Sequence, residues 1–260
     1  MTTLLMVFAF VLMALLLFFF LYIPWGMCWG ATDEECVMQM EGDRYLDEES
    51  SDRLVMTRAI SISKPPETVW PWLAQLGRGA GWYSIDLLDN AGKRSARHIV
   101  SWIPAPQIGD ASPIGYLCYQ DSGRELVWRS GDSQFLGSVV RMVMDFKVIP
   151  KKEGSRLIVR ISSDAKGISA RIVKWIFIFI DTIMARRQLL GIKERVELYG
   201  ARSKNHKEPE NGSRDQYQSY KIIYASGETA GTQEEDKALY WHQAAVKDGV
   251  IKTGKSHDYE

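Results

Sequence analysis

The sequence predicts an α+β fold in which a curved antiparallel sheet wraps around a long C-terminal helix, with a transmembrane helix in front. Three observations lead to this prediction. The main part of the chain contains one strand-like segment, two helical segments and four consecutive strand-like segments, and it closes with a long helical stretch. A long apolar run precedes all of them. Strands and helices that are segregated along the chain in this way are typical of α+β domains.

The composition of the chain favours a folded domain and excludes several classes of protein. Of its 260 residues, 46% are apolar and 25% are charged, so the chain can bury a core. The 32 basic and 32 acidic residues balance, and we therefore expect no nucleic-acid partner. Three cysteines exclude a disulfide scaffold, and four histidines that are far apart in sequence predict no metal site. We also expect no cofactor.

The N-terminal run predicts a membrane anchor. Residues 4–23 read LLMVFAFVLMALLLFFFLYI and contain no charged side chain. Twenty helical residues span about 30 Å, which is the thickness of the hydrocarbon core of a bilayer. A cleaved signal peptide is the alternative, but no Lys or Arg precedes the run, the run is long, and no cleavage site stands out. We expect a single-pass membrane protein, and the side of the membrane on which the soluble domain lies stays open because neither flank is basic.

Residues 24–54 are expected to form an acidic linker. Residues 32–53 contain nine acidic side chains against two arginines, a net charge of −7. Such a stretch is expected to be solvated, at least in part, and to be repelled by anionic lipid headgroups.

The main domain is expected over residues 55–200. Residues 57–63 alternate polar and apolar, as a half-buried strand does. A helix is expected from Pro66 or Glu67 to Gly77, because proline and an acid suit a first turn, and a short helix is expected over residues 85–91. Four further strands are expected at residues 114–120, 125–130, 138–150 and 156–162, and the long helix at residues 167–199. Asp145 would point to the face opposite Met144 and Phe146, which predicts exposure to solvent.

Several segments resemble a known superfamily. They are WGATDEE (29–35), EGD (41–43), AISISKPPETVWPWLAQLGRGAGWYSIDLLDN (59–90), SRLIVRIS (155–162) and RRQLLGIKERVE (186–197). Together they resemble the polyketide cyclase-like branch of the SRPBCC superfamily, which has the START/Bet v 1-like helix-grip fold. The resemblance covers roughly residues 29–200. It implies a central cavity that holds a lipid, sterol, polyketide or other hydrophobic molecule, and it carries over no catalytic motif.

Large apolar side chains of the main domain are the candidates for the wall of such a cavity. They are Trp70, Trp82, Tyr83, Trp128, Phe146, Trp175, Phe179 and Ile183. Ordinary core packing is the competing interpretation, since large aromatic residues dominate cores.

Arg78, Asp86 and Asp89 form an alternative polar site. Paired carboxylates can do acid–base chemistry, whereas surface salt bridging is the simpler interpretation. The glycine-rich segment at residues 77–81 follows a helix and lacks Gly-Lys-Ser/Thr, so we expect a flexible connection with Arg78 exposed and no phosphate loop.

The C-terminal part of the chain is expected to be an appendage. Residues 201–219 are polar and predict a flexible linker. Residues 220–260 faintly resemble a single Sel1-like helical repeat, which cannot bury its own apolar face and would need the main domain or a protein partner. Before it, residues 166–195 contain seven basic and two acidic side chains. A solvated outer face is expected there, and contact with anionic lipid is the alternative.

The expected function is membrane-anchored binding of a lipid or other hydrophobic small molecule in a helix-grip cavity. One alternative is a polyketide cyclase-like enzyme, which would need an Asp, Arg, Tyr or His in the cavity, and Asp86, Tyr83 and Arg78 are the nearest candidates. A second alternative is a structural or interaction module that recruits a partner through its C-terminal tail.

Overall fold

The fold is given by a computed structural model, which describes residues 2–46, 53–167 and 169–200. The predicted linker at residues 201–219 and the predicted repeat at residues 220–260 lie outside the described residues.

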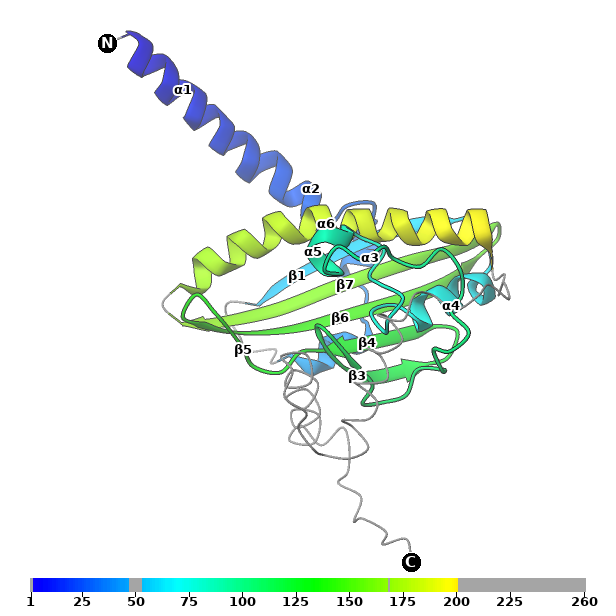
Figure 1. The fold of residues 1–260 in the computed structure, drawn as a ribbon. Helices are drawn as coiled ribbons and strands as arrows, with labels where there is room; N and C mark the ends of the chain where they lie inside the picture. The colour runs from blue at the N-terminus through cyan, green and yellow to red at the C-terminus, as the bar shows by residue number, and fades with distance from the viewer. Residues whose placement is uncertain (1, 47–52, 168, 201–260) are drawn as a thin grey trace, which may run out of the picture.

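A seven-stranded antiparallel sheet forms the body of the domain (Figure 1). The order of its strands is β1-β7-β6-β4-β3-β2, and β5 pairs with β6. The strands are β1 (Leu54–Ile62), β2 (Ala111–Ser112), β3 (Gly115–Asp121), β4 (Glu125–Arg129), β5 (Ser133–Phe135), β6 (Ser138–Lys151) and β7 (Gly154–Gly167).

Helices lie before, within and after the strands. At the N-terminus are α1 (Thr2–Leu17), a π-helical segment η1 (Phe18–Tyr22), α2 (Ile23–Met27), α3 (Asp33–Val37) and a 3-10 helix η2 (Glu41–Tyr45). The main domain contains α4 (Pro66–Ala74), α5 (Asp86–Asp89) and α6 (Ala170–Tyr199). The long α6 runs along one face of the sheet (Figure 1), so the predicted helix-grip α+β fold is confirmed.

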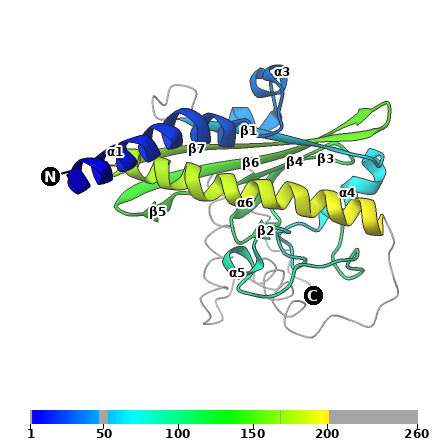
Figure 2. The same ribbon diagram turned by 90° about the horizontal axis from the view of Figure 1, so that it is seen from above.

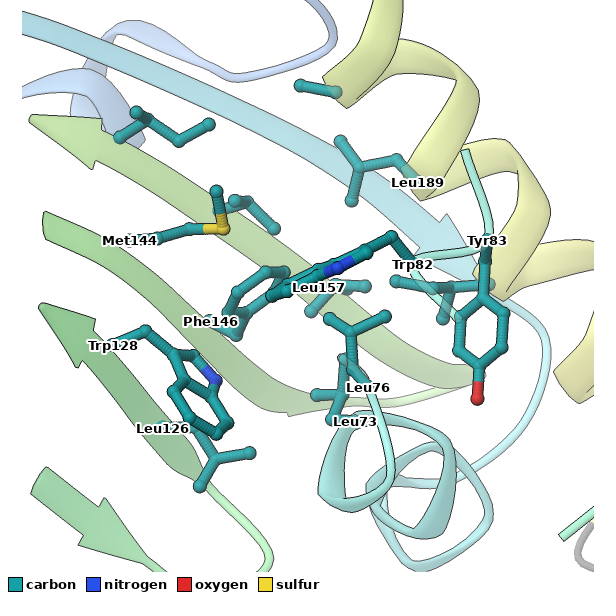
Figure 3. Packing of buried hydrophobic residues seen from close by; sticks show 14 of the residues in the cluster. Leu73, Leu76, Trp82, Tyr83, Leu126, Trp128, Met144, Phe146, Leu157 and Leu189 are labelled. Carbon is teal, nitrogen blue, oxygen red and sulfur yellow. The ribbon is translucent and has the colours of Figure 1, made fainter. Parts of the chain in front are cut away.

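The side chains of the long strands point alternately to the two faces of the sheet, as the sequence pattern requires. On β6 and β7, Met144, Phe146 and Leu157 face α6 and belong to the main core. Their neighbours Asp145 and Ile158 point to the opposite face, because successive side chains of a strand alternate. Figure 3 shows the core between sheet and helix, with Trp128 on β4 and Leu189 on α6 contributing from either side.

The opposite face of the sheet is covered, which corrects two expectations. Within the segment expected to be a solvated linker, residues 33–46 form α3 and η2 and pack on this face, where Met40 lies against Ala59 and Ile158. Asp145, expected in solvent, is buried there, and the Gly42 amide donates a 2.7 Å hydrogen bond to its carboxylate. Burial, together with the adjacent Glu125, raises the pKa of Asp145 well above its usual range.

Ion pairs hold this acidic segment on the sheet. Arg156 contacts the Glu35 carboxylate at 2.7 Å, and Arg160 contacts the Asp43 carboxylate at 2.7 Å. The negative charge of the segment therefore has partners in the folded domain, which the local composition alone does not reveal.

The loop after α4 lies close to α6. Gly191 of α6 approaches the Tyr83 carbonyl so closely that a Cβ atom at residue 191 would lie 2.1 Å from that oxygen. Arg195, one turn further on, donates from Nε to the Ala96 carbonyl at 2.8 Å. These contacts place residues 82–96 beside the C-terminal half of α6.

The N-terminal helices form one apolar rod that leaves the domain. The most apolar 18-residue window of the helix over Thr2–Met27 has a mean hydropathy of 3.1, and this window is not buried in the protein. It is long and apolar enough to cross a membrane. In Figure 1 α1 points away from the sheet, starting from the side on which α6 lies.

The base of this rod packs on α6. Phe19 contacts Trp175 edge to face at 5.1 Å between ring centroids, and Tyr22 contacts Phe179 at 5.6 Å. Below them, Gly26 lies against Thr182, where a Cβ atom at residue 26 would be 2.5 Å from the threonine hydroxyl oxygen.

Candidate ligand-binding cavity

A cavity of about 330 Å³ lies between α6, the sheet and the loops around α5. Most of its wall is apolar. The sheet contributes Met142, Met144 and Ile161; α6 contributes Phe177, Ile180, Met184 and Ala185; and the loops and α5 contribute Trp82, Leu88, Pro113 and Ile114.

Four polar side chains also line the cavity: Ser84, Asp89, Asp181 and Gln188. Three of them have partners in the protein. Asp181 accepts from Arg58 Nη1 at 2.6 Å, Gln188 donates to the Trp82 carbonyl at 3.1 Å, and Ser84 donates to the Met184 carbonyl at 2.9 Å. These bonds fix the positions of the polar side chains in an otherwise apolar wall.

Asp89 differs from the other three. Both of its carboxylate oxygens are buried, and no described residue donates a hydrogen bond of normal geometry to them. The neighbouring Ser84 has a single hydroxyl proton, which the Met184 carbonyl accepts. Burial and the nearby charge of Asp86 raise the pKa of Asp89 to about 6. Asp89 is therefore a buried carboxyl group at the wall of the cavity whose pKa lies well above that of an ordinary aspartate.

This shift predicts a pH dependence of stability. The pKa of Asp89 is raised from 3.8 to about 6 by folding, so the folded state binds the proton more tightly than the unfolded state does. The free energy of unfolding should therefore fall as pH rises from about 4 to about 6 and then level off, as far as this group is concerned. In Asp89→Asn, the contribution of this group to the fall in the free energy of unfolding between about pH 4 and about pH 6 should be absent.

Urea unfolding followed by tryptophan fluorescence across that pH range would measure the effect. Glu194→Gln, at an exposed position of α6, is the matched control and should leave the profile unchanged. An unaltered pH profile for Asp89→Asn would show that Asp89 is not protonated in this way.

The structure places the sequence-predicted apolar candidates in three different environments. Trp82 lines the cavity. Figure 3 shows it reaching across the sheet towards Phe146, while Tyr83 points away. Trp128, Phe146 and Tyr83 belong to the filled core, and Trp70 packs on that core half-buried.

The remaining apolar candidates, Trp175, Phe179 and Ile183, are not in the cavity wall. Trp175 and Phe179 contact the N-terminal helix, as described above, and Ile183 is exposed. All three lie on the outward side of α6, because the inward positions of that helix are held by residues such as Ile178 and Leu189.

The alternative polar site is not assembled as a unit. Arg78, expected to be exposed, is buried and pairs with Asp110 at 2.7 Å, while donating to the Ala74 and Pro104 carbonyls at 2.8 Å. A buried guanidinium can satisfy several carbonyls at a helix end, which a glycine-rich sequence does not indicate. Asp86 accepts from the Ser95 hydroxyl and amide. Of the three predicted residues, Asp89 lines the cavity.

Sequence reasoning missed the buried pair of Arg58 and Asp181. Arg58 lies in the middle of β1 and Asp181 in the middle of α6, 123 residues apart. The one local indication is an arginine at a position of β1 where the alternation requires an apolar residue, between Met56 and Ile60. Among the described residues, no group of three metal-ligating side chains is found.

Comparisons with known proteins give similarity in structure. No family model and no curated protein matches the chain. A protein from Mesorhizobium loti is 13% identical, with 56% of this chain aligned to 98% of that chain at a TM-score of 0.37. The di-domain ARO/CYC protein BexL is also 13% identical, covering 57% of this chain and 52% of that chain at a TM-score of 0.34.

A Polyketide_cyc-like protein from Corynebacterium glutamicum is 15% identical, covering 60% of this chain and 99% of that chain at a TM-score of 0.29. The similar solved structures thus include polyketide cyclase-like proteins. At such identities and scores the similarity carries no argument about what this chain binds.

Proposed function

We propose that the protein binds a small amphipathic molecule, with a largely apolar body and one polar group, in the cavity beside α6 while its N-terminal helix anchors it in a membrane. The observation that carries the proposal is the cavity itself. Its volume of about 330 Å³ lies at the lower end of the range for small-molecule sites. Its wall combines methionine, isoleucine and aromatic side chains with few polar groups, as ligand sites do.

The energetics favour an apolar ligand. Burial of about 300 Å² of apolar surface is worth roughly 7.5 kcal/mol at about 25 cal/mol per Å², before the costs of ordering are subtracted. An unpaired Asp89 carboxylate would favour a ligand that donates a hydrogen bond to it, since a buried acceptor without a partner is costly. A hydroxyl or amine on the ligand would serve.

The N-terminal helix supports the proposal that the ligand is a molecule that partitions into membranes. Residues 2–27 form a helix that can cross a bilayer, and its base packs directly on α6, which is also a wall of the cavity. The cavity would then stay within a short distance of the phase in which apolar amphiphiles concentrate.

Mass spectrometry of the full chain, extracted gently from membranes, tests the proposal. We expect a co-purifying lipid or other amphiphile at stoichiometric amounts. Ala185→Trp, which fills the cavity from α6, should lose it, whereas Glu194→Trp on the exposed face of the same helix should retain it. A folded wild-type protein that carries no amphiphile and takes up no apolar fluorescent probe would refute the proposal.

An enzyme is the second candidate, and Asp89 is the observation that favours it. A carboxyl group with a pKa of about 6 at a cavity wall can act as a general acid or base. A polyketide cyclase-like reaction would use it to move a proton on an aromatic or polyketide substrate. Asp89→Asn should then abolish turnover while leaving uptake of the molecule in place, and equal loss of both would favour simple binding.

A further inference from the structure

The N-terminal half of α6 presents an apolar face that the protein does not cover. Ile172 is 61% exposed, and Ile180 and Ile183 are 46% exposed. Their neighbours Val173 and Ile178 are buried against the domain, so this part of the helix is apolar on both sides. A surface helix normally carries polar residues on its outer face.

Two other elements extend this face. Leu87 and Leu88 of α5 are 77% and 64% exposed, and Leu136 in the turn between β5 and β6 is 59% exposed. Leu88 and Ile180 both line the cavity, so α5 and α6 flank its mouth. The Ser169 hydroxyl, just before α6, donates to the Leu136 carbonyl, so the turn lies at the start of the helix. We call Ile172, Ile180, Ile183, Leu87, Leu88 and Leu136 the apolar rim.

Phe179, which precedes the rim residue Ile180 on α6, joins this face to the base of the N-terminal rod. Phe18 contacts Phe179 at 6.0 Å between ring centroids, and the Tyr22 hydroxyl donates to the Phe179 carbonyl at 3.3 Å. In Figure 2 α6 lies between the rod and α5. The segment that can cross a membrane therefore leaves the domain on the side of the helix that carries the exposed isoleucines.

Basic side chains lie at both ends of this part of α6. Arg171 is exposed and Lys174 half-exposed near the start of α6, and Arg186 and Arg187 are exposed beyond Ile183. Arg186 also lies over the ring of Trp29, 5.2 Å from its centroid. An apolar stripe between basic groups is typical of helices that lie in the interface of a membrane, and each basic residue near anionic headgroups adds about 1 kcal/mol.

We propose that the apolar rim lies on the bilayer surface, so that the cavity mouth between Leu88 and Ile180 opens directly towards lipid. The inference rests on the anchoring part of the proposed function and does not depend on what the cavity holds. We infer that the bilayer covers this face for two reasons. The rod that would enter the bilayer leaves the domain beside the face, and basic residues flank the face. An amphiphile could then pass between bilayer and cavity without crossing water.

Spin labels on the full chain in nanodiscs that contain anionic lipid test this arrangement. In a Cys28→Ser/Cys36→Ser background, which keeps only the buried Cys118, one exposed cysteine at a time is placed at Ile172, Ile183 or Leu87. Two reference sites are Leu12 in the rod and the exposed Ser122 in the turn between β3 and β4. Accessibility to oxygen, which concentrates in lipid, is compared with accessibility to a water-soluble nickel chelate.

We expect the three rim labels to favour oxygen, as Leu12 does, and Ser122 to favour nickel. A rim that favours nickel while Leu12 favours oxygen would overturn the inference and leave the anchor intact. A Leu12 label that favours nickel would show that the anchor itself fails. Loss of both accessibilities together with spin–spin broadening at Ile183 would show that a second copy covers the face, which also overturns the inference.

Discussion

Replacing Arg58 with methionine should lower the free energy of unfolding by about 3–5 kcal/mol, because the change leaves the buried Asp181 carboxylate without its counter-charge. The Arg58 side chain is 1% exposed and lies 2.6 Å from Asp181. It also donates from Nε to the Gly26 carbonyl at 2.7 Å and from Nη2 to the Thr182 hydroxyl at 3.3 Å. Unfolding in urea, followed by tryptophan fluorescence of the full chain in detergent, measures the effect.

A double variant separates the lost pair from lost packing. Arg58→Met/Asp181→Leu removes both charges and should recover much of the stability, since replacing a buried ion pair with apolar side chains is often neutral or stabilising. A double variant no more stable than Arg58→Met would show that the bonds to Gly26 and Thr182 are the larger contribution.

The pH dependence of Arg58→Met provides a second check. Burial raises the pKa of Asp181, and Arg58 opposes that rise. Without Arg58 the carboxyl should accept a proton at a higher pH, which makes its burial less costly. The gap in stability between the variant and the wild type should therefore narrow as pH falls.

Arg58 also links the three parts of the molecule on which the proposed function depends. It lies on β1, it pairs with a residue of α6 that lines the cavity, and it holds the backbone of α2 at the base of the rod. Replacing Arg58 should therefore affect the position of the N-terminal helix relative to the cavity as well as the stability of the domain.

Most of the sheet could be predicted from the sequence because polar and apolar residues alternate along its strands. The expected strand at residues 138–150 corresponds to β6, and the turn at Lys151–Gly154 closes the β6–β7 hairpin. The expected strand at residues 156–162 ends five residues before β7 does, because Asp164 and Lys166 interrupt its apolar pattern while the backbone pairing continues. The short strands β2 and β5 were missed, since two or three residues carry no periodicity.

The candidate site was harder to predict, because one periodic pattern on α6 serves several partners. Trp175 and Phe179 recur at helical spacing with Ile183, as core residues do, yet they meet the N-terminal rod, while Phe177 and Met184 line the cavity. Helical spacing identifies a face and does not say what covers it. Buried ion pairs such as Arg78 with Asp110 were missed because their partners are far apart in sequence.

The acidic segment before β1 gives the other large effect that we expect. Arg160 on β7 is 4% exposed in its side chain and reaches out of the sheet into this segment. It donates to the Met38 carbonyl at 2.6 Å and to the Glu35 and Cys36 carbonyls at 3.0 Å, in addition to Asp43. Hydrogen bonds that involve a charged group are worth about 1.5–3 kcal/mol each, so several are lost together in Arg160→Met.

Arg160→Met should therefore cost about 3 kcal/mol or more and release residues 33–46 from the sheet before the rest of the domain unfolds. Hydrogen exchange followed by mass spectrometry should show faster exchange in that segment and in β1, with α6 little changed. Lys166→Met, at an exposed position of the same strand, is the control and should exchange like the wild type. Unchanged exchange of residues 33–46 in Arg160→Met would contradict this prediction and would mean that the apolar contacts of Met40 and the ion pair of Arg156 with Glu35 suffice to hold the segment.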